Sequence, residues 1–155
     1  MSRILAHTVR TTDAAETERF GAALGERIRR GACVCLTGPL GAGKTVFVKG
    51  LCRGLGAVDP VTSPTFILME SFAGRLPIVH VDLYRLEHER EVEDIGVFDM
   101  VDGETVVIAE WGERSPALLE EADLEIRIEP GEGTARTIHV HATPDFAPEI
   151  RELTW

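Results

Sequence analysis

The chain has 155 residues, of which 26 are acidic and 16 basic, and its formal net charge is −10. A chain of this length buries about 70% of the surface that its unfolded form exposes, so one domain with a substantial core is expected. The acidic balance argues against autonomous nucleic-acid binding, which depends on basic side chains that neutralise phosphates. No apolar run approaches the roughly 20 residues that span a bilayer. We expect no signal peptide, because the first residues lack a sustained apolar stretch.

The three cysteines indicate the cellular compartment. Cys33 and Cys35 alternate along an apolar segment, and Cys52 lies in a later one. No second ligand pair completes a zinc site. We therefore expect buried thiols in a reduced, cytoplasmic protein.

The first elements in chain order are a short strand and an amphipathic helix. Residues 3–10 alternate weakly between apolar and polar side chains, which favours an edge strand. Thr12 and Asp13 are typical N-cap residues, and Glu16 follows Asp13 at the spacing of a capping box. The helix that follows is expected to run to about Arg30.

A glycine-rich loop follows the next predicted strand, an apolar run at residues 32–37. Residues 38–45 match the G-x-x-x-x-G-K-S/T pattern of a phosphate-binding loop (P-loop). An amphipathic helix begins directly after it and ends near residues 54–56. Strand, loop and helix are the context that this pattern requires, so the chain is predicted to bind a nucleoside triphosphate. The predicted binding residues are Gly38, Pro39, Leu40, Gly41, Ala42, Gly43, Lys44, Thr45 and Val46.

The chemistry of the loop depends on its backbone and two side chains. Successive N–H groups and the positive end of the helix favour bound phosphates. Lys44, which we expect to be exposed, would add a compact positive charge, and the hydroxyl of Thr45 would bind Mg²⁺.

The segments after this helix predict a strand pair. Residues 59–64 are rich in turn formers, and strands are expected at residues 65–72 and 76–81, joined by a hairpin at residues 73–75. A charged helix is expected at residues 87–95.

The C-terminal third of the sequence contains patterns that predict further β-strands. Residues 106–109 form a continuous apolar run, typical of a strand covered on both faces. Residues 124–129 and 135–142 alternate cleanly on either side of a turn, which indicates a hairpin. The sum is a three-layer α/β fold of the P-loop NTPase type, with a mixed, mainly parallel sheet and antiparallel edge hairpins.

Two carboxylates follow apolar strands and could serve a metal ion. Asp82 follows residues 78–81, and Glu110 follows residues 106–109. One could hold the metal and the other could orient an attacking water, or either could simply cap a helix. The residues alone do not rank them.

A second polar segment, Thr62-Ser63-Pro64-Thr65-Phe66, lies where related enzymes place a loop that senses the γ-phosphate. Its hydroxyl groups could reach the metal or the phosphate. A polar turn that enters a strand is the alternative, and the sequence leaves both open.

Taken together, these motifs resemble the TsaE family (also called YjeE). The matching segments occur in family order across nearly the whole chain, and the H-x-D-L-Y-R-L string followed by E-W is far more specific than the loop. They are residues 38–45, 63–66, 80–86 and 110–111. The chain departs from the family at Pro39, where Asp or Asn is usual, and at Val46, where a second threonine is frequent.

The resemblance implies roles for individual residues. Glu110 would be the Walker B metal ligand, and Asp82 would orient the attacking water or belong to the metal network. Thr65 would lie in a switch-like loop. Trp111 would pack beside the nucleotide, with simple core packing as the alternative. The residues implied near the nucleotide base are Thr12, Asp13, Ala14 and Arg136.

The resemblance also implies a function. The family's ATPase subunit uses ATP and Mg²⁺ and works with TsaB and TsaD, which hold the tRNA and attach the threonylcarbamoyl group to adenosine. Hydrolysis would reset that complex between turnovers. Two alternatives remain: a small P-loop phosphotransferase, for which Arg85, Arg90 or Arg114 could clamp phosphate, and a non-catalytic nucleotide-gated module. The sequence lacks the arginine-rich lid insertion that a phosphotransferase of this type needs. A non-catalytic module does not explain why the loop lysine and both candidate acids are intact.

Overall fold

The computed structural model describes residues 2–58 and 69–155. The strands are β1 (Ile4–Thr11), β2 (Ala32–Thr37), β3 (Met69–Ala73), β4 (Pro77–Asp82), β5 (Val106–Glu110), β6 (Leu124–Pro130) and β7 (Arg136–Ala142). The helices are α1 (Ala14–Arg27), α2 (Lys44–Gly54), α3 (Arg90–Asp94), α4 (Val97–Met100), the 3-10 turn η1 (Gly112–Arg114), α5 (Pro116–Glu121) and α6 (Ala147–Arg151). Among the described residues, no helix combines the length and the apolar character needed to cross a bilayer.

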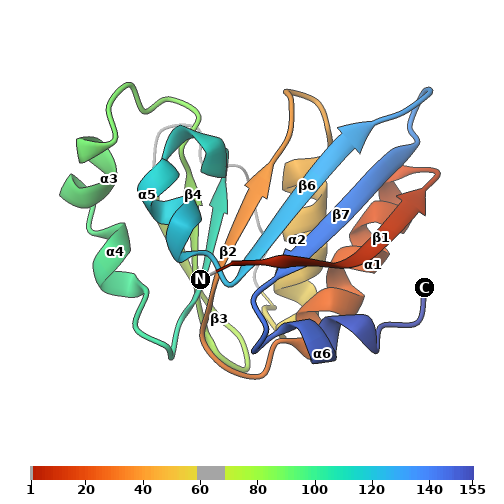
Figure 1. The fold of residues 1–155 in the computed structure, drawn as a ribbon, viewed down its shortest axis with the longest axis horizontal. Coiled ribbons are helices and arrows are strands. Elements are labelled where there is room, and N and C mark those ends of the chain that lie inside the picture. Colours follow the sequence, from red (N-terminus) through yellow and green to blue (C-terminus); the bar gives the residue numbers. More distant parts are fainter. Residues whose placement is uncertain (1, 59–68) are drawn as a thin grey trace.

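The seven strands form one mixed sheet in the order β1-β7-β6-β2-β5-β4-β3 (Figure 1). The central strands β6, β2, β5 and β4 are parallel to one another, and antiparallel pairing joins β1, β7 and β6 on one side and β3 and β4 on the other. This confirms the predicted α/β fold with a mixed sheet. The P-loop follows β2, in the middle of the parallel part.

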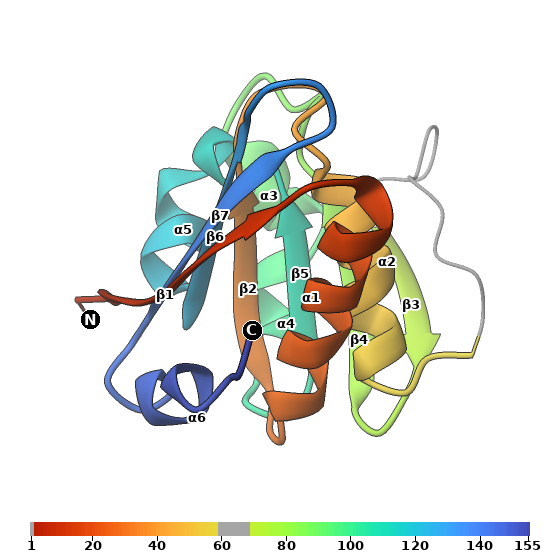
Figure 2. The ribbon, with the colours of Figure 1, turned by 90° about the vertical axis from the view of Figure 1, so that its right-hand side faces the viewer.

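The two faces of the sheet carry separate apolar clusters because side chains alternate along each strand. Along β2, Val34 and Leu36 belong to the cluster that includes α1, α2 and α6, whereas Cys33 and Cys35 belong to the one that includes α3, α4 and α5. Figure 2 shows α1 and α2 together on one side of the sheet and α5 on the other. All three cysteines are buried free thiols, as expected.

Helix α1 differs from its prediction at both ends. Asp13 is the N-cap, and its carboxylate accepts from the backbone N–H of Glu16 at 2.8 Å. Only half of a capping box forms, because the Glu16 carboxylate accepts from the Thr12 hydroxyl instead. The helix ends at Arg27 rather than near residue 30, because Ile28 adopts an extended backbone conformation and is fully buried.

Helices α3 to α6 also differ from the sequence analysis. The charged helix α3 is shorter than expected, and α4, α5 and α6 were not predicted. Helix α5 begins at a recognisable signal: Ser115 is the N-cap, its hydroxyl accepts from the N–H of Leu118, and Pro116 follows. Residues 65–68 of the predicted strand lie outside the described residues, and β3 covers its remainder from Met69 to Ala73.

Glycines allow α1 and α2 to pack with their backbones in close contact. A Cβ on Gly50 would collide with the carbonyl oxygen of Glu18, and one on Gly54 would collide with that of Ala22. Arg53 and Glu18 also form an ion pair between the two helices. Because α2 begins at the P-loop, this packing fixes the position of the loop.

We expect Gly50→Ala to lower the free energy of unfolding by roughly 2–3 kcal/mol, the upper part of the range for overpacking, because a rigid backbone oxygen must move. Urea unfolding measures the change. Lys49→Ala, on the same helix but exposed, serves as the control and should stay within about 0.5 kcal/mol of the wild type. Equal stability of the two variants would contradict the packing argument.

Candidate functional site

Backbone geometry prepares the P-loop for an anion. Gly38, Gly41 and Gly43 have φ angles of 138°, 78° and 99°, which side-chain-bearing residues rarely adopt. Gly43 is the N-cap of α2 and provides no side-chain cap. The N–H groups of the first helical turn therefore lack a capping acceptor, and the positive end of the helix dipole favours a negatively charged ligand there.

Lys44 is buried, with 5% of its surface exposed. Its Nζ donates to the carbonyl oxygens of Gly38 at 2.5 Å and Pro39 at 2.9 Å, and it lies 3.8 Å from the centroid of the Trp111 ring. The expectation of an exposed lysine was therefore wrong, because the loop and the indole enclose the ammonium. Burial lowers the pKa of Lys44, and the carboxylates of Glu113, Glu110 and Asp82 oppose that shift.

Trp111 adopts a strained backbone conformation directly after β5. Its φ of 61° is the only positive value among the described residues other than glycine, and bulky residues rarely adopt the left-handed region. The turn brings the indole over Lys44, while its ring centroid lies 4.8 Å from that of Tyr84. Trp111 thus lies beside the P-loop rather than only in the core.

The two carboxylates that the sequence could not rank lie side by side. Asp82 at the end of β4 is paired in register with Glu110 at the end of β5. One oxygen of Glu110 accepts from the Thr45 hydroxyl at 2.9 Å, and Asp82 accepts from the backbone N–H of Tyr84 at 3.0 Å. Burial raises the pKa of Asp82, the Tyr84 N–H lowers it, and the charge of Glu110 raises it further.

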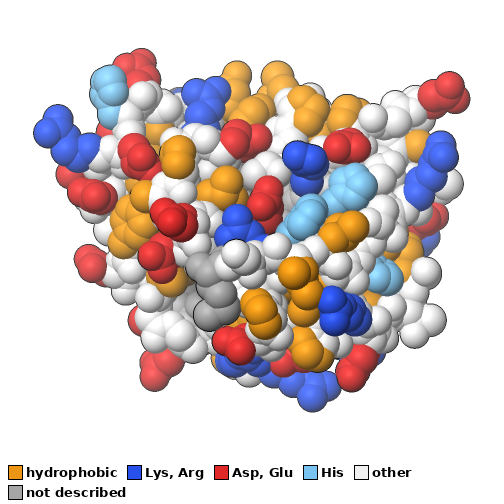
Figure 3. Space-filling view, viewed as in Figure 1, with side chains coloured by type: hydrophobic (Ala, Val, Ile, Leu, Met, Phe, Trp, Pro, Cys, Tyr) orange, Lys and Arg blue, Asp and Glu red, His pale blue; other side chains and the backbone are white. Residues whose placement is uncertain are grey.

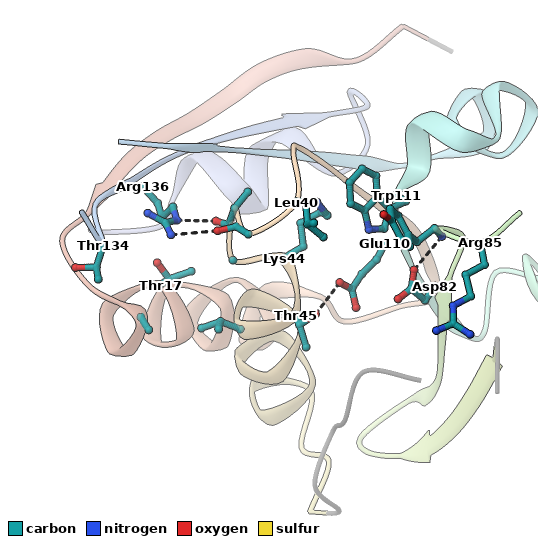
Figure 4. Close-up of a pocket in the computed structure, with 16 residues that line it drawn as sticks. Thr17, Leu40, Lys44, Thr45, Asp82, Arg85, Glu110, Trp111, Thr134 and Arg136 are labelled. Atoms are coloured by element: carbon teal, nitrogen blue, oxygen red, sulfur yellow. Dashed lines mark hydrogen bonds between the residues drawn. The ribbon is translucent and has the colours of Figure 1, made fainter. Parts of the chain in front are cut away.

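These groups line a cavity of about 520 Å³, within the range usual for small-molecule sites. Figure 4 shows Thr17, Thr134 and Arg136 at one end, Lys44 and Thr45 in the middle, and Asp82, Arg85, Glu110 and Trp111 at the other end. The remaining P-loop residues of the lining are Leu40, Gly41, Ala42, Gly43 and Val46. Gly38 and Pro39 instead line a separate hollow behind the loop.

The residues predicted near a nucleotide base divide into two groups. Arg136 lines the cavity, but its guanidinium donates to the carbonyl oxygens of Ala42 at 2.8 Å and Gly41 at 3.1 Å, so it braces the P-loop. Ala14 and Thr17 line the cavity, whereas Thr12 and Asp13 do not. Base binding by Thr12, Asp13, Ala14 or Arg136 stays a prediction, and Thr17 was not predicted to line the cavity.

Comparison with known proteins agrees with this geometry. The family model described as "Threonylcarbamoyl adenosine biosynthesis protein TsaE" matches residues 11–138. The chain belongs to the TsaE family. The resemblance inferred from the sequence motifs is confirmed.

Individual TsaE relatives match over most of their length. The Treponema pallidum (strain Nichols) protein is 44% identical over 115 residues, which cover 74% of this chain and 85% of the relative. The Streptomyces coelicolor protein is 38% identical over 139 residues, covering 87% and 86%. Both are named tRNA threonylcarbamoyladenosine biosynthesis protein TsaE. The crystal structure of Bacillus subtilis YdiB superimposes with a TM-score of 0.72 at 28% identity, covering 98% of this chain and 95% of that one.

The sequence analysis assigned no role to two residues of this TsaE chain, His80 of the H-x-D-L-Y-R-L string and Glu113. His80 Nε2 lies 2.6 Å from the second carboxylate oxygen of Glu110, and a carboxylate oxygen of Glu113 accepts from the backbone N–H of Gly38 at 3.1 Å. His80 was detectable as a polar residue two positions before Asp82, on the same face of a buried strand. Thr65, with its segment at residues 62–66, lies outside the described residues, so its role stays a prediction.

The donor set fits a magnesium ion. The hydroxyl of Thr45 and the carboxylates of Glu110 and Asp82 supply oxygen atoms, which Mg²⁺ prefers. Within residues 2–58 and 69–155, no group of three or more His, Cys, Asp or Glu side chains forms a metal cage. In nucleotide sites Mg²⁺ takes one or two protein ligands and completes its shell with phosphate oxygens and water.

Proposed function

We propose that this TsaE chain is a Mg²⁺-dependent ATPase that serves threonylcarbamoyladenosine modification of tRNA together with TsaB and TsaD. One observation carries the proposal: the Thr45 hydroxyl of the P-loop lies 2.9 Å from the Glu110 carboxylate, and Asp82 is paired beside Glu110. A P-loop hydroxyl next to strand-end carboxylates is the arrangement that P-loop NTPases use for nucleotide hydrolysis.

In this proposal the loop binds the phosphates and the strand ends organise the metal. The open N–H groups at the start of α2 and the Lys44 ammonium would bind phosphate oxygens. Thr45 and Glu110 would hold Mg²⁺, which when bound neutralises charge that develops on the phosphate oxygens. Asp82 lines the same cavity and would accept a hydrogen bond from the attacking water, thereby orienting it toward the γ-phosphate.

Surface charge supports a role in which partners hold the tRNA. The net charge is −10, and on the face seen in Figure 3 the basic side chains are scattered among acidic ones. Autonomous binding of a polyanion needs clustered positive charge. The cytoplasmic location expected from the sequence is consistent with tRNA modification, and hydrolysis that resets the partner complex requires no RNA contact by this chain.

We expect steady-state phosphate release at saturating Mg²⁺–ATP to be slow for the isolated chain and to rise at least about tenfold with TsaB and TsaD. Of the two arginines that line the cavity, Arg136 is already bonded to loop carbonyls and Arg85 lies at the end with Asp82. An arginine supplied in trans accelerates related NTPases by about 10³–10⁵-fold.

Phosphate release also separates the alternatives. Release of free phosphate distinguishes hydrolysis from transfer to an acceptor molecule, and no turnover with or without partners would indicate a binding module. Full activity of the isolated chain that is unchanged by TsaB and TsaD would contradict the partner-dependent mechanism and favour a phosphotransferase.

A further inference from the structure

His80 is a polar residue in an apolar strand. Its neighbours along β4 include Ile78, Val79 and Val81, all buried, and its own side chain is completely buried. Among the described residues, the ring Nδ1 atom has no hydrogen-bond partner. A buried polar atom without a partner is destabilising, so packing alone does not explain a histidine at this position.

The contact of the other ring nitrogen, Nε2, explains the presence of a histidine at this position better. Nε2 lies 2.6 Å from Oε2 of Glu110, whose side chain is only 3% exposed. A carboxylate oxygen accepts hydrogen bonds, so the tautomer with its proton on Nε2 is the one that donates to Glu110. The second oxygen, Oε1, accepts from the Thr45 hydroxyl. Each oxygen of Glu110 therefore has one partner, one from the sheet and one from the P-loop.

Strand register places His80 within reach of the Glu110 carboxylate. His80 is paired with Ile108 and Asp82 with Glu110, so His80 lies two residue pairs deeper in the sheet than the two acids, on the same face. His80 does not line the cavity, whereas Glu110 and Thr45 do. It can act on a bound ligand only through Glu110.

We propose that His80 is a positioning residue that anchors one oxygen of Glu110 in the sheet and so keeps the other directed at Thr45, where Mg²⁺ would bind. This inference rests on the proposed function. A carboxylate held in place has less rotational freedom to lose when a metal binds, and the loss of such an outer partner typically weakens metal affinity or activity by about 10–100-fold.

Three substitutions test the proposal. His80→Leu removes the donor, His80→Gln places an amide N–H close to where Nε2 lies, and His80→Asn carries the same amide on a shorter side chain. Binding of a non-hydrolysable ATP analogue to the full chain is measured by calorimetry over a series of Mg²⁺ concentrations and in EDTA. We expect His80→Leu and His80→Asn to raise the Mg²⁺ concentration for half-maximal binding by about 10–100-fold. For His80→Gln we expect that concentration to stay much closer to the wild-type value.

The comparison in EDTA separates positioning from general damage. Metal-free nucleotide affinity should stay within about twofold of the wild type in all three variants, because His80 acts only through the metal ligand. If His80→Leu fails to fold, the comparison of His80→Asn with His80→Gln still tests the proposal. Unchanged Mg²⁺ dependence in folded His80→Asn, or equal weakening with and without metal, would overturn the proposal. A wild-type chain that binds no nucleotide would instead overturn the proposed function.

Discussion

Lys44→Ala should reduce affinity for Mg²⁺–ATP at least about a hundredfold and bring phosphate release to background. Lys44 is the only lysine that lines the cavity, and its ammonium lies between two loop carbonyls and the Trp111 ring. In water-excluded sites a fixed positive charge stabilises charge on phosphate far more than it does in bulk solvent. Calorimetry and phosphate release measure the two effects.

The chain supplies its own matched control. Lys49 is the only other lysine, and it is exposed on the same helix, so Lys49→Ala should bind and hydrolyse ATP as the wild type does. Lys44→Ala loses hydrogen bonds of about 0.5–1.5 kcal/mol each and should still fold, as circular dichroism can check. Near-normal hydrolysis by folded Lys44→Ala would show that the P-loop is not the site.

Short-range patterns made the P-loop predictable from the sequence. Strand, glycines, lysine and helix are consecutive, and each glycine is required by a local backbone angle. The strand-end acids were predictable for a similar reason, because apolar runs identify parallel strands and Asp82 and Glu110 are the residues at their ends. Their adjacency, however, depends on the pairing of β4 with β5, which no local pattern specifies.

Contacts between distant segments were not predictable. The bond from His80 to Glu110 depends on the register of two strands, and the bracing of the P-loop by Arg136 depends on the hairpin of β6 and β7 folding over the loop. The burial of Lys44 depends on Trp111, which has a left-handed backbone conformation that bulky residues rarely adopt. Such a local conflict is expected where function opposes local preference.

Isosteric substitutions of the two acids should separate metal binding from turnover. Glu110→Gln should weaken Mg²⁺-dependent nucleotide binding, because Glu110 is the carboxylate bonded to Thr45. Asp82→Asn should leave binding within about twofold but lower kcat about a hundredfold or more, because orienting a water matters mainly in the transition state. The amide oxygen of the Asn variant can still accept from the Tyr84 N–H, so the backbone there should not change.

Stability provides an independent check on Asp82. Burial raises the pKa of Asp82 in the folded state above its ordinary value, so the folded chain binds this proton more tightly than the unfolded chain. The stabilisation from that proton is fully present below the unfolded pKa and is lost as pH rises through the folded pKa. At neutral pH the ionised carboxylate therefore destabilises the fold, and Asp82→Asn should raise the urea midpoint at pH 7 while it lowers turnover, as expected for a residue kept for function. A variant that loses nucleotide binding in parallel with Glu110→Gln, or that is less stable than the wild type at pH 7, would show that Asp82 holds the metal or the fold rather than the water.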